Sequence, residues 1–161
     1  MILTKQVGVF LNLVHNRTKQ FVATNLQENG FNITPEQFLV MDTLWNEGTM
    51  SQQQLSQHIM KDKNSIVKLI DGLEKKNLVQ RIADKTDRRQ NLIELTPAAW
   101  EIKEKATEAA IGSIDLIIKD IPHEEMAVFI KVLSKMAANM DKETDLIELT
   151  KKGIRPSEIK Y

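Results

Sequence analysis

Several residue types are missing or scarce in this 161-residue chain, and each absence excludes a class of protein. Cysteine is absent, which excludes a disulfide framework, a zinc site built from thiolates and a cysteine-based redox sensor. No apolar run approaches the roughly 20 residues that a membrane-spanning helix needs. The first six residues, MILTKQ, lack the charged start and apolar stretch of a signal peptide. We therefore expect a cytoplasmic protein without a membrane partner.

Motifs of catalysis and metal binding are absent as well. The chain contains no G-x-S-x-G sequence, no phosphate-binding loop and no dinucleotide fingerprint. Its three histidines, His15, His58 and His123, lie far apart and show no H-x-x-E-H-type spacing. Acidic residues are common, but none is paired with an evident base or nucleophile. We expect no enzyme, no cofactor and no metal site, although the sequence leaves open a site assembled from distant residues.

Charge of one sign is also lacking, because 22 basic and 22 acidic residues give a net charge of zero. The distribution is less even. Residues 51–95 carry nine Lys and Arg against six Asp and Glu, a surplus of three that the rest of the chain cancels. Attraction to phosphate depends on local charge, so this modest basic region is compatible with nucleic-acid binding. The hydrophobic share of 42% is ordinary for a folded protein and argues against disorder.

What the chain does contain is a series of helix signals. Apolar residues recur at helical spacing from residue 4 to residue 28, and Gly30 is a plausible stop. Four later helices begin with a capping residue, in two cases followed by proline: Thr34, Ser51, Asp62 and Thr96. Pro122 opens a final helix. The expected helices cover residues 4–28, 34–48, 51–60, 62–76, 97–119 and 122–140.

The segment 51–97 holds the pattern around which the chain is organised. Its second helix, 62–76, carries a stripe of apolar residues at spacings of three and four: Ile66, Leu69, Ile70 and Leu73. A short link joins this helix to the one before it, which is the helix-turn-helix arrangement. Two strand-like segments, 78–83 and 91–95, then flank a charged loop that is longer than a tight hairpin turn. Together these features predict a winged helix-turn-helix.

The fold class that follows is mainly α with a small β-hairpin wing. Long helices precede and follow the winged helix-turn-helix, and their length exceeds what the central unit needs, which indicates dimerisation by the ends of the chain. We expect one intertwined domain with four parts: an N-terminal dimerisation helix (1–33), a winged helix-turn-helix DNA-binding region (34–96), C-terminal dimerisation helices (97–145) and a tail (146–161).

Four segments carry more specific motifs: Leu73–Arg81 (LEKKNLVQR), Asp87–Arg89 (DRR), Ile93–Thr96 (IELT) and Ile33–Phe38 (ITPEQF). In their order and spacing, these segments resemble the multiple-antibiotic-resistance regulator (MarR) family, and the resemblance covers residues 11–140. Two positions depart from it, since the family usually has Gly where this chain has Asn77 and commonly where it has Ala99. Asn tolerates the left-handed conformation of a helix cap and Ala favours helix, so we expect the fold to survive.

The resemblance implies a homodimeric winged-helix repressor or activator. Its partners would be double-stranded DNA, a second copy of the chain and a small aromatic or anionic effector, bound in a pocket between the dimerisation region and the DNA reader. In such proteins derepression follows when the ligand changes the spacing of the two recognition helices. The first two helices usually wall that pocket, which singles out His15, Met41 and Trp45, although Met and aromatic residues at helical spacing are also typical of plain core.

Residues on the polar face of helix 62–76 are the first candidates for DNA contact: Lys63, Asn64, Ser65 and Lys68. In a helix-turn-helix the start of the second helix enters the major groove, where Lys donates to guanine and Asn pairs with adenine. A solvated helix face looks the same in isolation, so the helix-turn-helix context carries the prediction.

The wing and the preceding helix supply further candidates. Matching the D-x-R motif assigns Arg89 to the minor groove, where negative potential is concentrated, with Asp87 orienting it and Arg88 meeting a phosphate. Gln52 and Gln53 begin the helix that positions the reader, and helix N-termini offer N–H groups to phosphate. We interpret Arg81 as structural, because a carboxylate is at least as good a partner for it as DNA.

The leading hypothesis is therefore a sequence-specific DNA-binding transcription regulator that acts as a homodimer on a pseudo-palindrome and responds to a small molecule. Two alternatives stay open at this point. The first is a winged-helix adaptor that binds proteins and no specific DNA, and it stays open because the basic surplus is mild. The second is a small-molecule carrier or enzyme that uses the dimer cavity, although the sequence shows no catalytic constellation for it.

Overall fold

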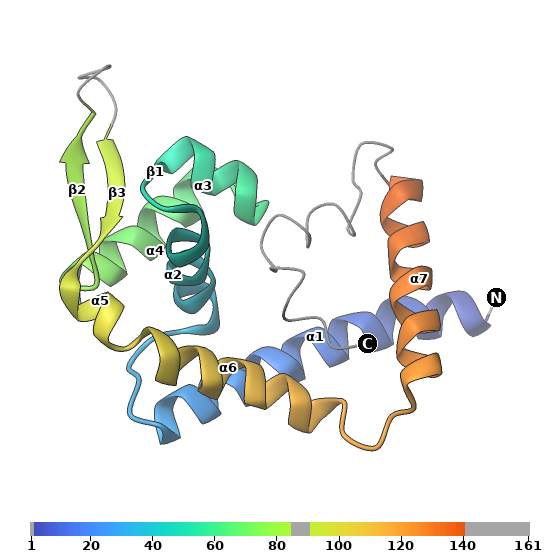
Figure 1. Cartoon of the computed structure of the whole chain (residues 1–161). Coiled ribbons are helices and arrows are strands. Elements are labelled where there is room, and N and C mark those ends of the chain that lie inside the picture. The colour runs from blue at the N-terminus through green and yellow to red at the C-terminus, as the bar shows by residue number, and fades with distance from the viewer. Residues whose placement is uncertain (1, 85–90, 141–161) are drawn as a thin grey trace. The chain divides into compact units, whose positions relative to one another are not determined.

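The computed structural model describes residues 2–84 and 91–140 (Figure 1). By its contacts the chain divides into two compact units, Met1–Ile117 and Ile118–Tyr161. The helices of the first unit are α1 (Ile2–Glu28), α2 (Pro35–Glu47), α3 (Gln52–Ile59), α4 (Lys63–Lys75), α5 (Pro97–Glu101) and α6 (Lys103–Ile117), and the second unit contributes α7 (His123–Met140).

The helix starts follow the capping residues that the sequence predicts. Thr34 and Ser51 each accept a hydrogen bond from a backbone N–H three residues on, and the side-chain oxygen of the Gln at that third position accepts one from the N–H of the capping residue. These capping boxes satisfy N–H groups that a helix leaves without partners. Thr96 caps α5 in a simpler way, by accepting from Ala99 N.

A three-stranded antiparallel sheet completes the first unit, with β1 (Met50–Ser51), β2 (Val79–Ala83) and β3 (Asn91–Leu95) in the order β1-β3-β2. The two long strands form the predicted hairpin, with Arg81 opposite Ile93. The sequence pattern missed β1, because a strand of two residues has no alternation to read. It adds an edge that joins the start of α3 to the wing.

The single helix expected over 97–119 is instead two helices. Ile102 has φ −91° and ψ −5° and ends α5, and α6 begins at the next residue. No Gly or Pro marks the break. Its cause lies in the packing, because α5 contacts β3 whereas α6 runs along α1, so one straight helix could not serve both neighbours.

The core of the first unit draws one or more side chains from α1, α2, α3, α4 and β3. Its fully buried members include Leu26, Met41, Leu44, Leu55, Ile66, Ile70, Leu73 and Ile93. Three of the four predicted stripe residues of α4 are among them, and the fourth, Leu69, is partly buried against the same cluster. Burying such a side chain contributes about 1.5–3 kcal/mol, so the stripe fixes which face of α4 points outward.

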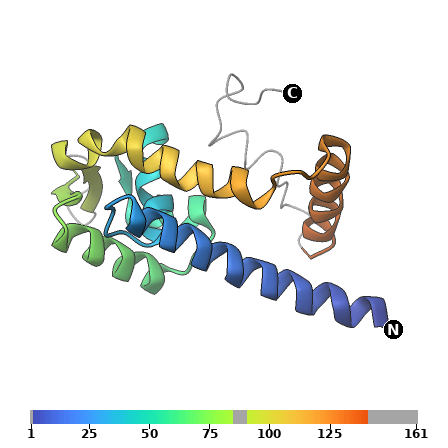
Figure 2. The ribbon, with the colours of Figure 1, turned by 90° about the horizontal axis from the view of Figure 1, so that it is seen from below.

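Helices α1 and α6 lie antiparallel and side by side (Figure 2). A polar contact fixes their register: Asn25 Nδ2 donates to Ala109 O at 2.9 Å and to the buried Ser113 Oγ at 2.7 Å. The N-terminal half of α1 has a different environment, because every side chain described from Leu3 to Arg17 is exposed. None of the helices in the described residues has the length and apolar character to cross a membrane.

Candidate nucleic-acid interface

Helices α3 and α4 form the predicted helix-turn-helix. Three residues separate them, and Met60 turns the chain with a positive φ of 55°. The turn is held from inside, since Ser56 Oγ donates to Lys61 O at 2.6 Å and Lys61 N donates to Ser56 O at 3.1 Å. These bonds fix the direction in which α4 leaves α3.

The first turn of α4 is organised by Asp62. Its carboxylate accepts from Ser65 N at 2.9 Å and from Ser65 Oγ at 2.5 Å. The bond from the Ser65 hydroxyl is the main reason that the pKa of Asp62 is lowered from its ordinary value, because hydrogen bonds to the charged form favour it. The Ser65 hydroxyl therefore donates its hydrogen bond to the capping carboxylate.

The outer face of α4 presents the other three predicted contacts. Lys63, Asn64 and Lys68 are exposed, whereas Ile66 and Ile70 of the same helix are fully buried. Two cations and a carboxamide thus share one solvent-facing surface at the N-terminal end of a helix whose other side is anchored. This surface has the residue types that donate to phosphate and to base edges in the major groove.

The start of α3, the helix that precedes α4, carries two further predicted contacts. Gln53 is exposed and Gln52 is partly buried, so both side chains reach solvent at a helix N-terminus. Gln54 does not share that freedom, because its Oε1 accepts from Ser51 N at 2.8 Å within the capping box.

The wing strand β2 is tied to α4 by Arg81. Its Nη2 lies 2.5 Å from Asp71 Oδ1, and its Nη1 forms a second ion pair with Glu74. This confirms the interpretation of Arg81 as a structural residue paired with carboxylates. The other wing candidates, Asp87, Arg88 and Arg89, lie outside the described residues, and their roles stay predictions.

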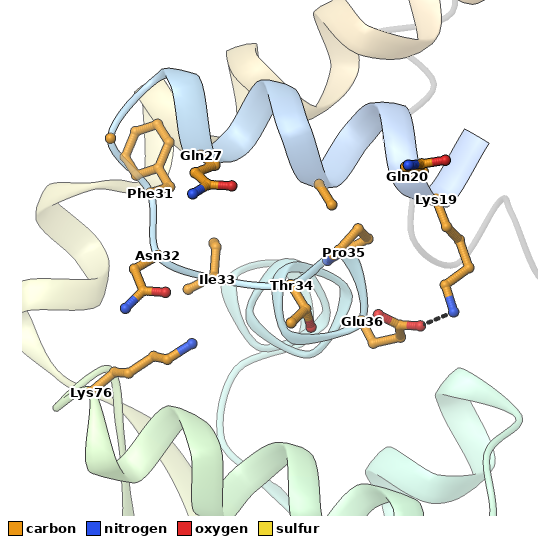
Figure 3. Close-up of a pocket in the computed structure, with 12 residues that line it drawn as sticks. Lys19, Gln20, Gln27, Phe31, Asn32, Ile33, Thr34, Pro35, Glu36 and Lys76 are labelled. Carbon is orange, nitrogen blue, oxygen red and sulfur yellow. Dashed lines mark ion pairs between the residues drawn. The ribbon is translucent and has the colours of Figure 1, made fainter. Parts of the chain in front are cut away.

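A pocket of about 600 Å³ lies between α1, the following loop, the start of α2 and the end of α4 (Figure 3). Lys19 and Glu36 form an ion pair at one end of it. Burial raises the pKa of Glu36, but the hydrogen bond from Lys19 and other smaller effects together hold it below the ordinary value. The lining residues are Lys19, Gln20, Ala23, Gln27, Gly30, Phe31, Asn32, Ile33, Thr34, Pro35, Glu36 and Lys76.

Lys76 enters the pocket from the end of α4. Its Nζ donates to Gln37 Oε1 at 2.7 Å, and burial lowers its pKa from the ordinary value, because removal from water disfavours the charged form. Sequence reasoning missed this pocket. The only local signal was the turn at Gly30, and Lys76 is brought to it from far along the chain.

The three residues expected to wall an effector pocket lie in different environments. Met41 and Trp45 are core residues, 0% and 5% exposed, and His15 is exposed on α1. Trp45 packs edge-on against Phe38, with ring centroids 6.0 Å apart. None of His15, Met41 and Trp45 lines the pocket in Figure 3. Across residues 2–84 and 91–140 no three His, Asp or Glu side chains group in a way that could hold a metal ion.

Comparison with known proteins identifies the family. The MarR family model matches residues 33–90, from the loop before α2 to the wing. The uncharacterised HTH-type transcriptional regulator YsmB of Bacillus subtilis is 30% identical over 115 residues, which cover 71% of this chain and 79% of YsmB. The chain belongs to the MarR family. The expected winged-helix fold and the expectation of a regulator instead of an enzyme are thereby confirmed.

Solved structures of similar proteins agree with this MarR-family assignment. A probable transcriptional regulator from Pseudomonas aeruginosa superposes with a TM-score of 0.75 at 26% identity, over 83% of this chain and 98% of that one. Reduced AbfR, in a structure bound to DNA, superposes with a TM-score of 0.71 at 25% identity, over 87% of this chain and 95% of that one.

Proposed function

We propose that this MarR-family chain is a sequence-specific regulator of transcription that binds double-stranded DNA as a homodimer. The observation that carries the proposal is the outer face of α4, where Lys63, Asn64 and Lys68 are exposed while the opposite face is anchored in the core. In this reading α4 enters the major groove, with Lys directed to guanine or phosphate and Asn to adenine.

Neighbouring elements complete the contact. The N-terminus of α3 with Gln52 and Gln53 meets the phosphate backbone, and Ser65 holds the first turn of α4 in shape and offers its oxygen as an acceptor. For the wing we retain the assignment that follows from its motif: Arg89 in the minor groove, Asp87 orienting it and Arg88 on a phosphate. The wing strand itself is kept next to α4 by Arg81.

The homodimer is supported by the apolar surface of α1. Leu3, Val7, Phe10 and Val14 follow one another at spacings of three and four and are 40–74% exposed. Such a stripe is the mark of a helix that packs on another element, and contiguous exposed apolar surface of this kind marks an interface. Two recognition helices related by a two-fold axis require a second copy of the chain. We therefore assign the apolar stripe of α1 to the contact with that copy.

The effector is proposed to bind in the pocket of Figure 3. Its lining combines apolar groups, such as Phe31, Ile33 and Pro35, with the ammonium group of Lys76. Concave sites with an apolar wall and one charged group are typical of small-molecule binding. This composition favours a small anion with an apolar or aromatic body.

The first test is selection of binding sequences from randomised DNA with the full chain. We expect a pseudo-palindrome with half-sites about one helical turn apart. Lys68→Ala should weaken binding to the selected DNA by about 1–3 kcal/mol and lower the slope of log affinity against log salt by about one, because one fewer counterion is released. Fluorescence anisotropy at several salt concentrations measures both quantities.

Lys105→Ala is the matched control, since Lys105 is also exposed but lies on α6. It should leave affinity and salt slope unchanged. Equal behaviour of the two variants would show that α4 does not face DNA, and a failure to select any sequence would favour the protein-binding adaptor.

A further inference from the structure

The pocket in Figure 3 holds one cation that no carboxylate balances among the residues that the structure describes. Lys19 is paired with Glu36. Lys76 instead donates to a neutral acceptor, the amide oxygen of Gln37, at 2.7 Å. Lys76 is partly buried and its hydrogen-bond partner is neutral, so an anion that enters the pocket meets a positive charge that the Gln37 amide does not neutralise.

Gln37 connects this cation to the start of α2. Its side chain is 6% exposed, and its Oε1 also accepts from Thr34 N at 3.1 Å as part of the capping box. The same oxygen therefore serves the first turn of α2 and the residue that ends α4. A change in the hydrogen bonding of Lys76 therefore also alters the surroundings of the oxygen that caps α2.

Gln37 also lies against the backbone of α4. A Cβ atom added to Gly72 would come within 2.4 Å of Gln37 Nε2, so only glycine lets the amide sit this close. One buried side chain thus contacts α4 at two places, Gly72 and Lys76, one turn apart. Because interiors are close-packed, this amide sets the distance between α2 and the C-terminal half of α4.

We propose that Lys76 and Gln37 form the link through which an anion in this pocket moves the DNA-reading helix. The inference rests on the proposed function, since it specifies how the effector site regulates the same helix. A carboxylate attracts an ammonium group through its charge as well as through the hydrogen bond, which a neutral amide cannot do. Lys76 Nζ therefore turns from Gln37 to the ligand, Gln37 loses one of its two contacts with α4, and α4 shifts relative to α2.

The experiment uses the full chain with benzoate as the anionic probe and benzamide as its neutral counterpart. Calorimetry measures their binding, and amide hydrogen exchange over residues 63–76 reports the state of α4 without DNA. Anisotropy with the selected DNA reports affinity for DNA. The unaltered chain should bind benzoate more tightly than benzamide, exchange faster in α4 when benzoate is bound, and lose affinity for DNA.

Lys76→Met removes the ammonium group and keeps an unbranched apolar stem. Its affinity for benzoate should fall about tenfold or more, while its affinity for benzamide stays the same. Lys75→Met is the matched control, because Lys75 is exposed, neighbours Lys76 and does not line the pocket. Benzoate binding by Lys76→Met that equals that of Lys75→Met would overturn the assignment of Lys76, as would no benzoate binding by the unaltered chain.

Gln37→Leu tests the link itself, and Gly72→Ala tests it a second way by pushing the amide off α4. Both variants should bind benzoate through Lys76, yet benzoate should no longer change hydrogen exchange in α4 or affinity for DNA. Thermal unfolding establishes that each variant is folded. A response to benzoate of unaltered size in both variants would overturn the link. If the unaltered chain bound no DNA, the proposed function would fail, and calorimetry and hydrogen exchange would still decide the link.

Discussion

At the scale of single residues, Asn77 shows how a departure from a family pattern is tolerated. It lies just after α4 with a φ of 55°, in the left-handed region. Its N–H donates to Glu74 O at 2.9 Å, and its carbonyl accepts from Thr96 Oγ1 at 2.7 Å. Asn visits this region more readily than other residues with a Cβ. Asn77 therefore turns the chain just after α4 and joins it to the start of α5.

Asn77→Ala is expected to lower the free energy of unfolding by about 1 kcal/mol, because a left-handed conformation costs an ordinary residue about that much. Asn77→Gly should be as stable as the unaltered chain. Urea denaturation of the two variants measures the difference. Equal stability of the Ala and Gly variants would show that the left-handed conformation is not maintained in solution.

Ser65 shows the limit of assigning a role from a helix face alone. It lies on the polar face of α4, where the sequence predicts a DNA contact, but its hydroxyl donates to Asp62. A hydroxyl has a single proton to donate, so Ser65 meets DNA as an acceptor of hydrogen bonds for as long as it holds this cap.

At the scale of elements, Arg81 joins the wing to the recognition helix. The side chain is 21% exposed, and its two nitrogens pair with Asp71 and Glu74, which lie about one turn apart on α4. A guanidinium group suits this task, because its planar fork presents several donors in fixed directions. The two ion pairs hold β2 and α4 together as one unit.

Arg81→Met is expected to destabilise the fold by about 1 kcal/mol, since both carboxylates are partly solvated and exposed ion pairs contribute little each. Hydrogen exchange in β2 should rise more than in α2. Arg81→Lys keeps the positive charge but cannot bridge both carboxylates in the same geometry. Its hydrogen exchange in β2 should therefore lie between that of the unaltered chain and that of Arg81→Met. Identical exchange in β2 for all three proteins would contradict a role of Arg81 in holding the wing.

At the scale of the whole molecule, the apolar stripe of α1 decides the assembly that we propose. Phe10 is 56% exposed within it, although burying such a side chain contributes about 1.5–3 kcal/mol. A helix whose apolar face meets only water gains little from packing, and packing supplies most helical stability in proteins. We therefore infer that a second copy covers this stripe.

Phe10→Asp should shift the chain toward monomers and weaken binding to a palindromic DNA, because one recognition helix then acts without its partner. Light scattering after size exclusion measures the mass. Asn12→Asp is the control: it adds the same charge to α1 but lies 200° around the helix from Phe10. A Phe10→Asp protein that keeps the mass and DNA affinity of Asn12→Asp would place the interface elsewhere.

Much of the fold was predictable from the sequence because it depends on chemistry within a few residues. The caps at Thr34 and Ser51 satisfy N–H groups three positions away, and the stripe of α4 follows the period of the helix. The hairpin strands could be read from their alternation. Local rules of this kind do not depend on what the rest of the chain does.

Other features were decided only by the tertiary structure, because they depend on residues far apart in the chain. The break at Ile102 follows from two different packing partners, and the two-residue strand β1 exists only because β3 is there to pair with it. The helical spacing of Met41 and Trp45 on α2 was typical of plain core as well as of a pocket wall, and the tertiary structure places both in the core. The pocket forms where the fold brings Lys76 to Gln37, 39 residues away, and no pattern along the sequence records that distance.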